Sequence, residues 1–530
     1  MSDYDADVIV VGAGSLGALA ALEIARAGRS VIILEAGPDL PNWKALLNFR
    51  SSPRKANFNA PFGDLPHAPN SYSPGYLDND LEVETIPGNL RVKGGTSRHW
   101  AGIAWRFLPE EMKMRSTFGV GRDWPLDYDE LEPFYTQAEY EVGVNGLDGD
   151  DQSGRGGGEY PPRSKPYPLP PEAKPYPLQR FQMRTAPLGY RLQHAPSTRH
   201  SQPWKGRAAC IGSNNCNPVC PVGARHSGVH DCEAAVAAGA QIRTDAVVDR
   251  LAVDGSGRIT EVSYQSPEGE RTTLSARAFV LAAHGFETPK LLLMNDLANR
   301  SGMVGRNFMV HPTLFMDMLA DEPVWLGRGQ YLHGAILQRR MENSRDRMAG
   351  GFYQFMNHSM GPTMAGRVIE EGGRIGAALD AEFRERAARY FTVHQLLEDL
   401  PRPENAITLN PSYRDSLGTP GIRVRYRLDS YTRAALPRAV DDYSNWLEAM
   451  GGVRLEAPGR KWYNQHHIMG TTIMGDDPTD SVVDADLRCH DHSNLFLVTT
   501  GVFPSSSCVN PTLTGMALAL RAGRTVAREI

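Results

Sequence analysis

The first 37 residues contain the feature that most constrains the fold, an alternation of two apolar runs with one helical segment. Val8–Val11 is an apolar run of strand length, and Ser15–Ala27 follows it with the spacing of a helix. Gly28 ends the helical segment, and Val31–Leu34 is a second apolar run. Short continuous apolar runs are typical of strands buried on both faces, so the pattern predicts a β-α-β unit with parallel strands.

Three glycines lie in the turn between the first predicted strand and the helix. Gly12, Gly14 and Gly17 have the spacing G-x-G-x-x-G, and Glu35 follows 18 residues after the last glycine. In dinucleotide-binding folds such glycines allow a tight turn, the close approach of a pyrophosphate and helix packing, while the acid accepts a hydrogen bond from ribose. The segment predicts dinucleotide binding, and the alternative is an ordinary structural turn.

Composition excludes several classes of function. With 530 residues, 41% of them hydrophobic, the chain can bury a large core in two or more structural units or in one composite domain. The 56 basic and 61 acidic residues give a net charge of −5 without a basic stripe, so nucleic acid is not the expected partner. No apolar stretch approaches the roughly 20 residues of a membrane helix, and no export signal is expected before the first strand.

Later segments predict the remaining parts of the nucleotide fold. Residues 91–106 combine paired glycines with polar and aromatic side chains and have no regular period, which predicts a loop pressed against a ligand. A further strand is predicted to break at Gly285, with a helix starting at Pro289. Near the C-terminus we expect a strand, a turn at Gly501 and a helix after Pro511. The fold would therefore close with the last residues of the chain.

These blocks, in this order, resemble the glucose-methanol-choline (GMC) family of FAD oxidoreductases over nearly the whole chain. Within that family, the stretches GVGRDWPLDYDELEPFY, VGRNFMVHP and SVVDADLRCHDHSNLF are similar to the catalytic subunits of bacterial FAD-dependent sugar dehydrogenases, of the glucose and fructose dehydrogenase type. The resemblance implies a mixed α/β (α+β) fold. A Rossmann-like FAD-binding domain would be built from discontinuous segments, and a substrate domain would cover the flavin with an antiparallel sheet.

The resemblance also implies how the chain is divided. Residues 1–300 would mainly form the FAD-binding domain, including an iron-sulfur segment at 205–235, and residues 301–460 would mainly form the substrate-binding domain. Residues 461–530 would carry the catalytic segment and return to the FAD-binding domain. The residues expected to contact FAD are Gly12, Gly14, Ser15, Gly17, Glu35, Ala36, Gly94, Gly95, Thr96, His99, Trp100, Ala101, Val248, Ala283, Gly501, Asn510 and Thr512.

Oxidation of an alcohol by a flavin needs a base that takes the hydroxyl proton while the hydride goes to flavin N5. Histidine titrates near neutrality and suits this task. In YNQHHIMGTTIMG, residues 463–475, the resemblance places the catalytic histidine on His467, and Asn510 matches the partner that binds the same hydroxyl. The related sugar dehydrogenases have asparagine at the position of His466, so this residue either shifts substrate choice or merely packs.

The other histidines have less specific interpretations. His99 occupies the position through which the related pyranose oxidases attach flavin covalently, and both covalent attachment and simple packing against the flavin ring are open. His284 and His311 are interpreted as cap, turn or surface residues. Since the chain lacks the H-E-x-x-H and G-x-S-x-G motifs, a zinc peptidase or a serine hydrolase is not indicated.

Half of the six cysteines fall in CIGSNNCNPVCP, which places Cys210, Cys216 and Cys220 within eleven residues. Thiolates in such a group are typical ligands of iron-sulfur clusters. Three close ligands favour a [3Fe-4S] over a [4Fe-4S] cluster unless Cys232 or another residue supplies a fourth, and the resembled sugar dehydrogenases bind a [3Fe-4S] cluster in this stretch. A zinc site completed by His226 and free buried thiols are the alternatives.

Together these features predict the FAD-dependent catalytic subunit of a dehydrogenase that oxidises a hydroxyl of a sugar, sugar alcohol or sugar acid. Electrons would leave through the [3Fe-4S] cluster to an external acceptor such as cytochrome c or a quinone. One alternative is a sugar or glycoside oxidase of the pyranose-oxidase type, which uses O2. The other is a non-catalytic flavoprotein that only transfers electrons.

The resemblance further implies partner proteins. A small companion subunit would carry an export signal and a multihaem cytochrome c would anchor the assembly. The location would then be periplasmic, with membrane association only through the partners. No C-x-x-C-H motif occurs, so any haem would belong to another polypeptide. Residues 149–178, rich in glycine and proline, predict an extended surface connection before the cysteines.

Overall fold

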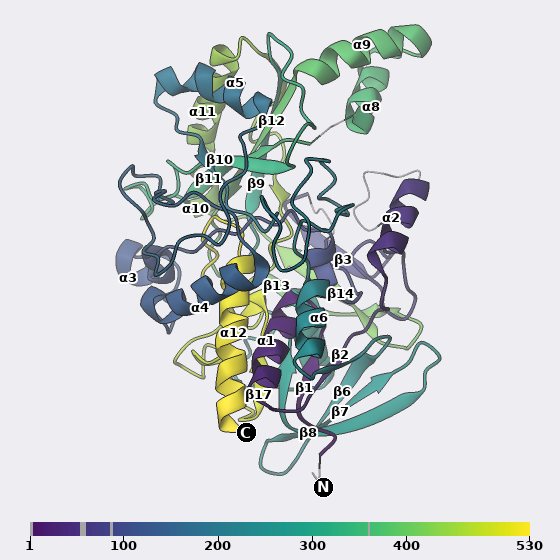
Figure 1. Ribbon diagram of the computed structural model, residues 1–530. Coiled ribbons are helices and arrows are strands. Elements are labelled where there is room, and N and C mark those ends of the chain that lie inside the picture. The colour runs from purple at the N-terminus through teal and green to yellow at the C-terminus, as the bar shows by residue number, and fades with distance from the viewer. Residues whose placement is uncertain (1–3, 53–59, 85–87, 359–360) are drawn as a thin grey trace.

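The computed structural model describes residues 4–52, 60–84, 88–358 and 361–530. Within these residues the chain forms two seven-stranded sheets and one three-stranded sheet. Figure 1 shows the sheet with the N-terminal strand in the lower half of the molecule and the second large sheet in the upper half, and both chain ends lie at the bottom. The lower sheet is hereafter the nucleotide sheet and the upper one the roof sheet.

The N-terminal β-α-β unit forms as predicted. Strand β1 (Ala6–Val11) leads through the glycine turn into helix α1 (Ser15–Arg26), and β2 (Val31–Leu34) returns parallel to β1 with Val8 opposite Val31. Both strands are almost fully buried, which is why they read as continuous apolar runs. The helix ends one residue before the predicted boundary.

Segments far apart in the sequence complete the nucleotide sheet. Strand β8 (Arg271–Leu281) lies parallel to β1 on the side opposite β2, and β17 (Leu495–Leu497) lies parallel to β8. Strand β5 (Gln241–Arg243) extends the other edge beside β2. The antiparallel strands β6 (Val247–Val253) and β7 (Ile259–Gln265) continue from β8. Helix α12 (Thr512–Glu529) packs on α1, so the fold closes with the C-terminal residues as expected.

The helix after β8 starts earlier than predicted. Strand β8 ends at Leu281 and helix α7 spans His284–Met294, so Pro289 lies inside the helix instead of at its start. A proline in a helix leaves the carbonyl four residues earlier without its usual donor. Here that carbonyl belongs to Gly285, and the hydroxyl of Thr471 donates to it at 2.8 Å. A tertiary contact therefore satisfies the group that the sequence left unpaired.

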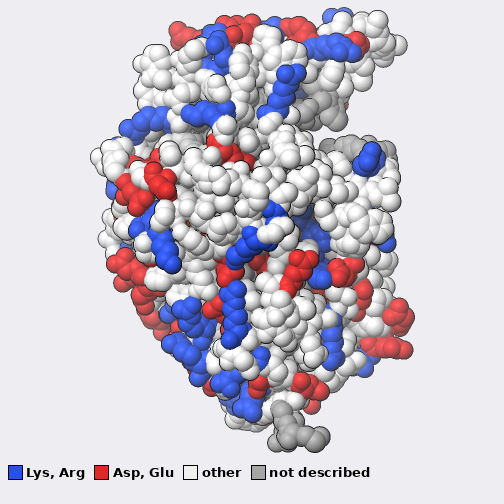
Figure 2. All heavy atoms as spheres, viewed as in Figure 1, with Lys and Arg blue, Asp and Glu red and all other residues white. Residues whose placement is uncertain are grey.

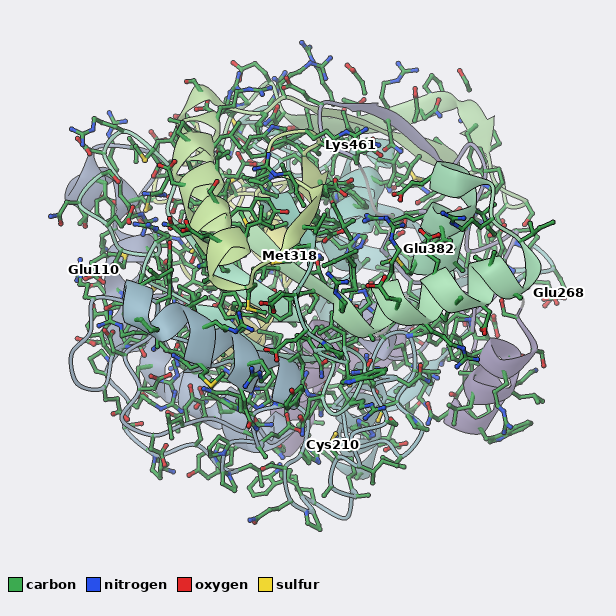
Figure 3. All side chains as sticks on the ribbon, turned by 90° about the horizontal axis from the view of Figure 1, so that it is seen from above. Glu110, Cys210, Glu268, Met318, Glu382 and Lys461 are labelled. Carbon is green, nitrogen blue, oxygen red and sulfur yellow. The ribbon has the colours of Figure 1, made fainter. Side chains whose placement is uncertain are left out.

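The roof sheet is antiparallel throughout, which confirms the predicted fold class. One of its faces packs beneath helices α5 (Tyr176–Thr185) and α11 (Leu436–Ala449), where Met318 and Trp446 share a core. Seen from above in Figure 3, Met318 lies under one of these helices. The strands in spatial order are β15 (Val453–Glu456), β9 (Pro312–Leu319), β12 (Tyr390–Leu397), β11 (Gly351–Met356), β10 (Leu332–Ile336) and β4 (Gln193–His194), with β16 (Tyr463–Asn464) also paired to β9.

The other face of the roof sheet contacts the nucleotide-binding part. Phe352 and Leu396 belong to the same hydrophobic core as β1, so the two halves are packed together without a layer of solvent. The remaining elements are α2 (Asn42–Ser51), β3 (Leu77–Leu81), η1 (Gly95–Arg98), η2 (Pro109–Met112), α3 (Met114–Phe118), α4 (Tyr128–Val142), η3 (Ala186–Leu188), α6 (Gly228–Ala237), α8 (Gly361–Gly372), α9 (Gly376–Arg389), β13 (Ala406–Arg414), β14 (Pro420–Tyr426), α10 (Ser430–Arg433) and η4 (Thr500–Val502).

The segment 149–178 is mostly irregular, but its last three residues begin helix α5 at Tyr176. The expectation of a wholly extended connection is wrong at this end, because Pro175 and Pro177 are tolerated at a helix start, where no backbone donor is needed. None of the helices described here is both long and apolar enough to cross a bilayer. Figure 2 shows acidic and basic side chains interspersed over the visible face, in line with the balanced composition.

Replacement of Gly12 by alanine tests the closeness of the glycine turn. Gly12 has a φ of +108°, and a Cβ there would lie 2.5 Å from the carbonyl oxygen of Ala282. Gly239 has a φ of +107° but open space around it, so Gly239→Ala adds only backbone strain, on the order of 1–3 kcal/mol. We expect Gly12→Ala to lower both the apparent melting temperature and the flavin content further than Gly239→Ala. Equal effects of the two variants would contradict this account.

Candidate active site

A cavity opens at the carboxyl ends of the parallel strands, the place where such sheets bind ligands. The cavity extends from the glycine turn at Gly12 to the histidines His466 and His467. The predicted residues that line it are Gly12, Gly14, Ser15, Glu35, Ala36, Gly95, Thr96, Trp100, Val248, Ala283, His467 and Thr512. The predicted residues that do not line it are Gly17, Gly94, His99, Ala101, Gly501 and Asn510.

The glycine turn has the local features that a pyrophosphate needs. A Cβ at Gly14 would meet no atom within 4 Å, so a ligand can approach the backbone there. Ser15 begins helix α1, and its hydroxyl oxygen is buried without a hydrogen-bond partner. A helix N-terminus attracts anions because its first N–H groups are free. At Gly17 a Cβ would clash with the carbonyl oxygen of Gly12 and would come within 2.9 Å of the Ala282 side chain. A glycine is therefore needed where helix α1 packs closely on the turn and on the end of β8.

Glu35 is held at the end of β2 by the backbone around it. The N–H of Ala13 donates to Oε2 at 2.9 Å, and the N–H of Gly37 donates to Oε1 at 3.1 Å. Burial raises the pKa of Glu35 above its usual range, although these two N–H groups oppose the shift. Since each carboxylate oxygen can accept further hydrogen bonds, the side chain can also bind a ribose hydroxyl. The turn and this acid together fit the nucleotide part of FAD.

A cluster of three charged side chains that no sequence pattern indicated also lines the cavity. Arg91, Glu287 and Lys290 all line it. Glu287 Oε2 lies 3.9 Å from Arg91 Nη1 and 3.7 Å from Lys290 Nζ, and the hydroxyl of Tyr76 also donates to this carboxylate. Arg91 Nη1 is buried and makes no hydrogen bond within the described chain, so it can serve a ligand. Glu287 lies before the predicted helix start at Pro289, so its i,i+3 spacing to Lys290 became meaningful only with the observed start at His284.

The loop after Arg91 packs against the glycine turn. Gly94 donates its N–H to the carbonyl of Ala13 at 2.9 Å, and a Cβ on Gly95 would lie 3.0 Å from the Cα of Gly14. Trp100 lines the cavity, and its indole N–H donates to the carbonyl of His226 at 2.7 Å. The loop therefore connects the nucleotide site to the segment that follows the cysteines.

His99 is buried behind this wall. One ring nitrogen, Nε2, lies 2.9 Å from the carbonyl oxygen of Gly88, and burial lowers the pKa of His99 to about 4. The ring is not among those that line the cavity. His99 is therefore packed behind the cavity wall. Flavin that stays with the polypeptide after denaturation of the loaded protein would show covalent attachment.

The fold brings the two predicted catalytic residues, His467 and Asn510, together. Asn510 Nδ2 lies 3.2 Å from His467 Nε2, although the two residues are 43 positions apart. The other nitrogen of His467, Nδ1, lies 2.7 Å from Nδ1 of His311. His311 is fully buried against the catalytic histidine, so its interpretation as a cap, turn or surface residue is wrong. It directly precedes strand β9, a place that the sequence alone does not connect with His467.

The contacts of His311 define where the protons lie. Its Nε2 is 3.2 Å and 3.1 Å from the carbonyl oxygens of Ser506 and Ser507, which only accept, so Nε2 carries the hydrogen. Burial lowers the pKa of His311 to about 4, so the ring is neutral at pH 7 and its Nδ1 is a bare acceptor. His467 must then donate from Nδ1. Burial, followed by His311 and His466, lowers the pKa of His467 well below its usual value. Nε2 of His467 therefore carries a lone pair, which accepts the Nδ2–H of Asn510 at 3.2 Å.

His466 and His284 also line the cavity. Burial lowers the pKa of His466 to about 3 and that of His284 to about 4, so both rings are neutral. His284 begins helix α7, and its Nδ1 accepts the N–H of Phe286 at 3.3 Å, which agrees with its interpretation as a cap. The site thus holds several uncharged imidazoles around one wall, an environment suited to a neutral, polar ligand.

The three clustered cysteines lie in the loop before helix α6. Cys216 and Cys220 are buried and Cys210 is half-buried, and none of the three forms a disulfide. Figure 3 places Cys210 toward the margin of the molecule, on the side opposite Lys461. Among the described residues, no three His, Cys, Asp or Glu side chains stand in a metal-ligating arrangement. The support for an iron-sulfur site in this loop is therefore the chemistry of the three free thiols and not their geometry.

The proposed additional ligands are engaged elsewhere. The thiol of Cys232 lies 3.3 Å from the carbonyl oxygen of Ala13, in the core beside the glycine turn. His226 Nε2 lies 2.9 Å from Asp231 Oδ2, so the ring of the suggested zinc ligand is paired with a carboxylate. Cys489 and Cys508 are buried in the main core. These placements leave the three cysteines of the loop as the candidates.

Known proteins with similar sequences identify the family. The GMC oxidoreductase family matches residues 168–313 and residues 401–519. Over 544 aligned residues the chain is 38% identical to the fructose dehydrogenase large subunit of Gluconobacter japonicus, with 99% of this chain and 98% of that protein covered. This chain is a GMC oxidoreductase. The expected family is confirmed, and with it an FAD-dependent oxidoreductase that acts on CH–OH groups.

Other relatives of this GMC oxidoreductase include both dehydrogenases and oxidases. It is 29% identical to the 2-methyl-1,2-propanediol dehydrogenase of Mycolicibacterium austroafricanum, over 99% of this chain and 95% of that protein. It is 25% identical to the gluconate 2-dehydrogenase flavoprotein of Pantoea cypripedii, over 97% and 92%. Among solved structures, pyridoxine 4-oxidase from Mesorbium loti shares the fold with a TM-score of 0.65 at 19% identity, over 98% and 99% of the two chains.

The lowered pKa of His467 predicts that this GMC oxidoreductase keeps its activity at lower pH than an ordinary histidine base would allow. The base must be neutral to accept a proton, and its neutral form persists down to its own pKa. Since burial holds that pKa below the ordinary value of about 6.5, we expect the acid limb of kcat/KM to fall below pH 6.5. The measurement is a pH profile of dye reduction at limiting substrate. An acid limb at or above pH 6.5 would contradict the assignment.

Two histidine variants extend this test: His311→Gln should change the profile, and His492→Gln is its control. His311→Gln removes one of the groups that lower the pKa of His467, so the acid limb should move to higher pH and kcat/KM should fall by about 10²-fold. His492 is also buried, but its ring contacts Ala298 and Gly257 away from the cavity. His492→Gln should keep the acid limb of the unmodified enzyme, and both variants should retain flavin.

Proposed function

We propose that this GMC oxidoreductase is the catalytic subunit of a dehydrogenase that oxidises a hydroxyl of a sugar, sugar alcohol or sugar acid. The observation that carries the proposal is the neutral imidazole of His467 on the cavity wall, whose unprotonated Nε2 faces the amide of Asn510. The substrate class is supported by relatives whose names specify fructose and gluconate as substrates. A cavity bordered by uncharged imidazoles also suits a neutral polyhydroxy compound.

The residues of the site have distinct tasks in this reaction. Bound FAD supplies the acceptor for the hydride that leaves the alcohol carbon. His467 takes the hydroxyl proton at Nε2, while Asn510 donates its amide N–H to the hydroxyl oxygen and fixes its position. His311 keeps the proton of His467 on Nδ1, so that the base always presents Nε2. Ser15, at the start of α1, and Glu35 hold the nucleotide part of the cofactor.

We further propose that Cys210, Cys216 and Cys220 hold a [3Fe-4S] cluster through which electrons leave one at a time. Support comes from three free thiols in one loop and from two buried arginines, Arg199 and Arg225, whose pKa values respond to these thiols. Burial raises the pKa of Cys210 to about 11 and that of Cys216 above its usual value, and the nearby positive charge opposes these shifts and so favours the thiolate, the form that binds iron. Ile211, an apolar residue in this loop, is 67% exposed. An exposed apolar side chain beside the cysteines supports an electron exit to a partner protein at this surface.

The electron acceptor and the location form part of the same proposal. The acceptor would be a cytochrome c or a quinone, and a small companion subunit would carry the export signal. This is supported by the relative named as a large subunit, a term that implies at least one further subunit in that enzyme. The complex would be periplasmic and would reach the membrane only through its partners. Cell fractionation after co-expression with candidate partner subunits would test this.

The substrate and the base are tested together by a dye-reduction screen over aldoses, ketoses, polyols and aldonates, with and without oxygen. We expect reduction of the dye by at least one of these classes and little consumption of O2. His467→Ala should keep FAD bound and lower kcat by about 10²–10⁴-fold, because it removes the base. Unchanged turnover in this variant would overturn the catalytic assignment. Turnover that depends on O2 instead of the dye would favour the oxidase alternative.

The cluster is tested by metal analysis of anaerobically purified protein. We expect about three irons per flavin, the content of a [3Fe-4S] cluster. Cys216→Ser should lose iron but keep the cavity and the substrate-dependent bleaching of flavin, because Cys216 does not line the cavity. Cys489→Ser changes an equally buried cysteine outside the loop and should keep its iron. Iron-free wild-type protein would refute the cluster and leave the flavin chemistry intact.

A further inference from the structure

One buried aspartate, Asp399, lies against both sides of His311, the histidine that contacts His467. His311 directly precedes strand β9, and Asp399 follows strand β12 by two residues. The two strands are antiparallel neighbours with Leu396 opposite Thr313, so the end of β12 lies beside the start of β9. The pairing within the roof sheet therefore brings Asp399 to the residues around His311.

The carboxylate of Asp399 holds the backbone on one side of His311. Its Oδ2 accepts the N–H of Val310, the residue before His311, at 3.3 Å and the hydroxyl of Tyr426 at 2.8 Å. Asp399 is 1% exposed, and burial raises the pKa of its carboxyl to about 7. A carboxyl oxygen can accept two hydrogen bonds whether the group is ionised or carries its proton on the other oxygen. The contact with Val310 therefore does not depend on one protonation state.

The backbone of Asp399 holds the other side of His311 through Ser506. The N–H of Asp399 donates to the hydroxyl of Ser506 at 2.9 Å, and this hydroxyl lies 2.9 Å from the carbonyl oxygen of Asp399 and 2.7 Å from that of Ser507. The carbonyl oxygens of Ser506 and Ser507 are the two that accept from His311 Nε2. Whichever carbonyl receives the hydroxyl proton, Ser506 ties Asp399 to the acceptors of His311.

The turn that carries these two carbonyls has a strained backbone. Ser507 has a φ of +52°, in the left-handed region that a non-glycine residue rarely adopts, at a cost on the order of 1–3 kcal/mol. Such a conformation persists only where the surrounding structure holds it. Ser506 is fully buried and its hydroxyl contacts the backbone of Asp399, so this residue is placed to hold the turn.

We propose that Asp399 and Ser506 are positioning residues that hold His311 so that its bare Nδ1 always faces the base. This inference rests on His467 as the base in the proposed function. Neither positioning residue lines the cavity, so both act through His311 and not on the substrate. If His311 is displaced, His467 loses the acceptor for its Nδ1 proton and can carry that proton on Nε2, where it can no longer act as the base. Loss of either contact should slow the chemical step without weakening substrate binding.

The first test is Ser506→Ala, with Ser505→Ala as the matched control. Ser505 is also buried, but its hydroxyl contacts the indole N–H of Trp124 and the carbonyl of Glu111 and not Asp399. We expect Ser506→Ala to lower kcat per bound flavin about tenfold and to leave KM within about twofold, because a misplaced base slows the reaction. Ser505→Ala should keep both constants of the wild type. An unchanged kcat in Ser506→Ala, or an equal loss in Ser505→Ala, would overturn the inference.

A double-mutant cycle shows whether the effect passes through His311. When Ser506→Ala is added to His311→Ala, kcat should change by less than about twofold, because the group that Ser506 positions is already absent. A loss as large as that in the wild-type background would mean that Ser506 acts independently of His311, and would overturn the inference.

Two variants of Asp399 test the carboxylate. Asp399→Leu removes the acceptor for Val310 at similar volume, whereas Asp399→Asn keeps an acceptor oxygen. We expect Asp399→Leu to lower kcat as Ser506→Ala does, and Asp399→Asn to keep at least about a third of the wild-type kcat. Equal losses in the two variants would overturn the role of the carboxylate as an acceptor. If Asp399→Leu does not fold, Asp399→Asn and the Ser506 cycle still decide.

Failure of the inference and failure of the proposed function give different results. Unchanged turnover in His467→Ala refutes the base, and the positioning role falls with it. An inactive His467→Ala together with a wild-type kcat in Ser506→Ala refutes only the positioning role. Flavin content and melting temperature, measured on every sample, separate both results from a general loss of folding.

Discussion

The pairing of β1 with β8, and of β8 with β17, is the constraint on which the rest of the structure depends. These strands come from the beginning, the middle and the end of the chain, and their parallel alignment brings their carboxyl ends to one edge. The glycine turn, the start of α7 and the segment before α12 therefore meet around one cavity. Burial of β1, β17 and the last four residues of β8 stabilises this alignment, because these stretches contribute almost only apolar side chains to the core.

Burial also determines the chemistry of the site. The histidines near the cavity lie where a charged imidazole would lose its hydration, so their pKa values are lowered and the rings are neutral. A neutral histidine has one donor and one acceptor nitrogen, and its neighbours decide which is which. The carbonyls of Ser506 and Ser507 orient His311, His311 orients His467, and the lone pair on Nε2 of His467 accepts from the amide of Asn510. A chain of ordinary hydrogen bonds thus orients the base before any substrate arrives.

The cysteine loop shows the opposite use of burial. Around His467 the interior favours neutral rings, whereas Arg225 is a guanidinium that is only 4% exposed. It donates to the carbonyls of Arg98 and Trp100 and so holds the loop at the cavity wall. The indole of Trp100 donates to the carbonyl of His226, which joins this wall to the segment after the cysteines.

The sequence by itself determined the nucleotide-binding unit, the family, the catalytic residues His467 and Asn510 as candidates, and the cysteine group. These are local patterns, in which spacing along the chain and residue type carry the information. Tertiary structure decided that His311 contacts His467, that Arg91 joins Glu287 and Lys290, and that Thr471 caps the carbonyl left free by Pro289. Each of these contacts joins residues from separate segments. Only the pairing of distant strands places them within hydrogen-bond reach, and no pattern within one segment encodes that pairing.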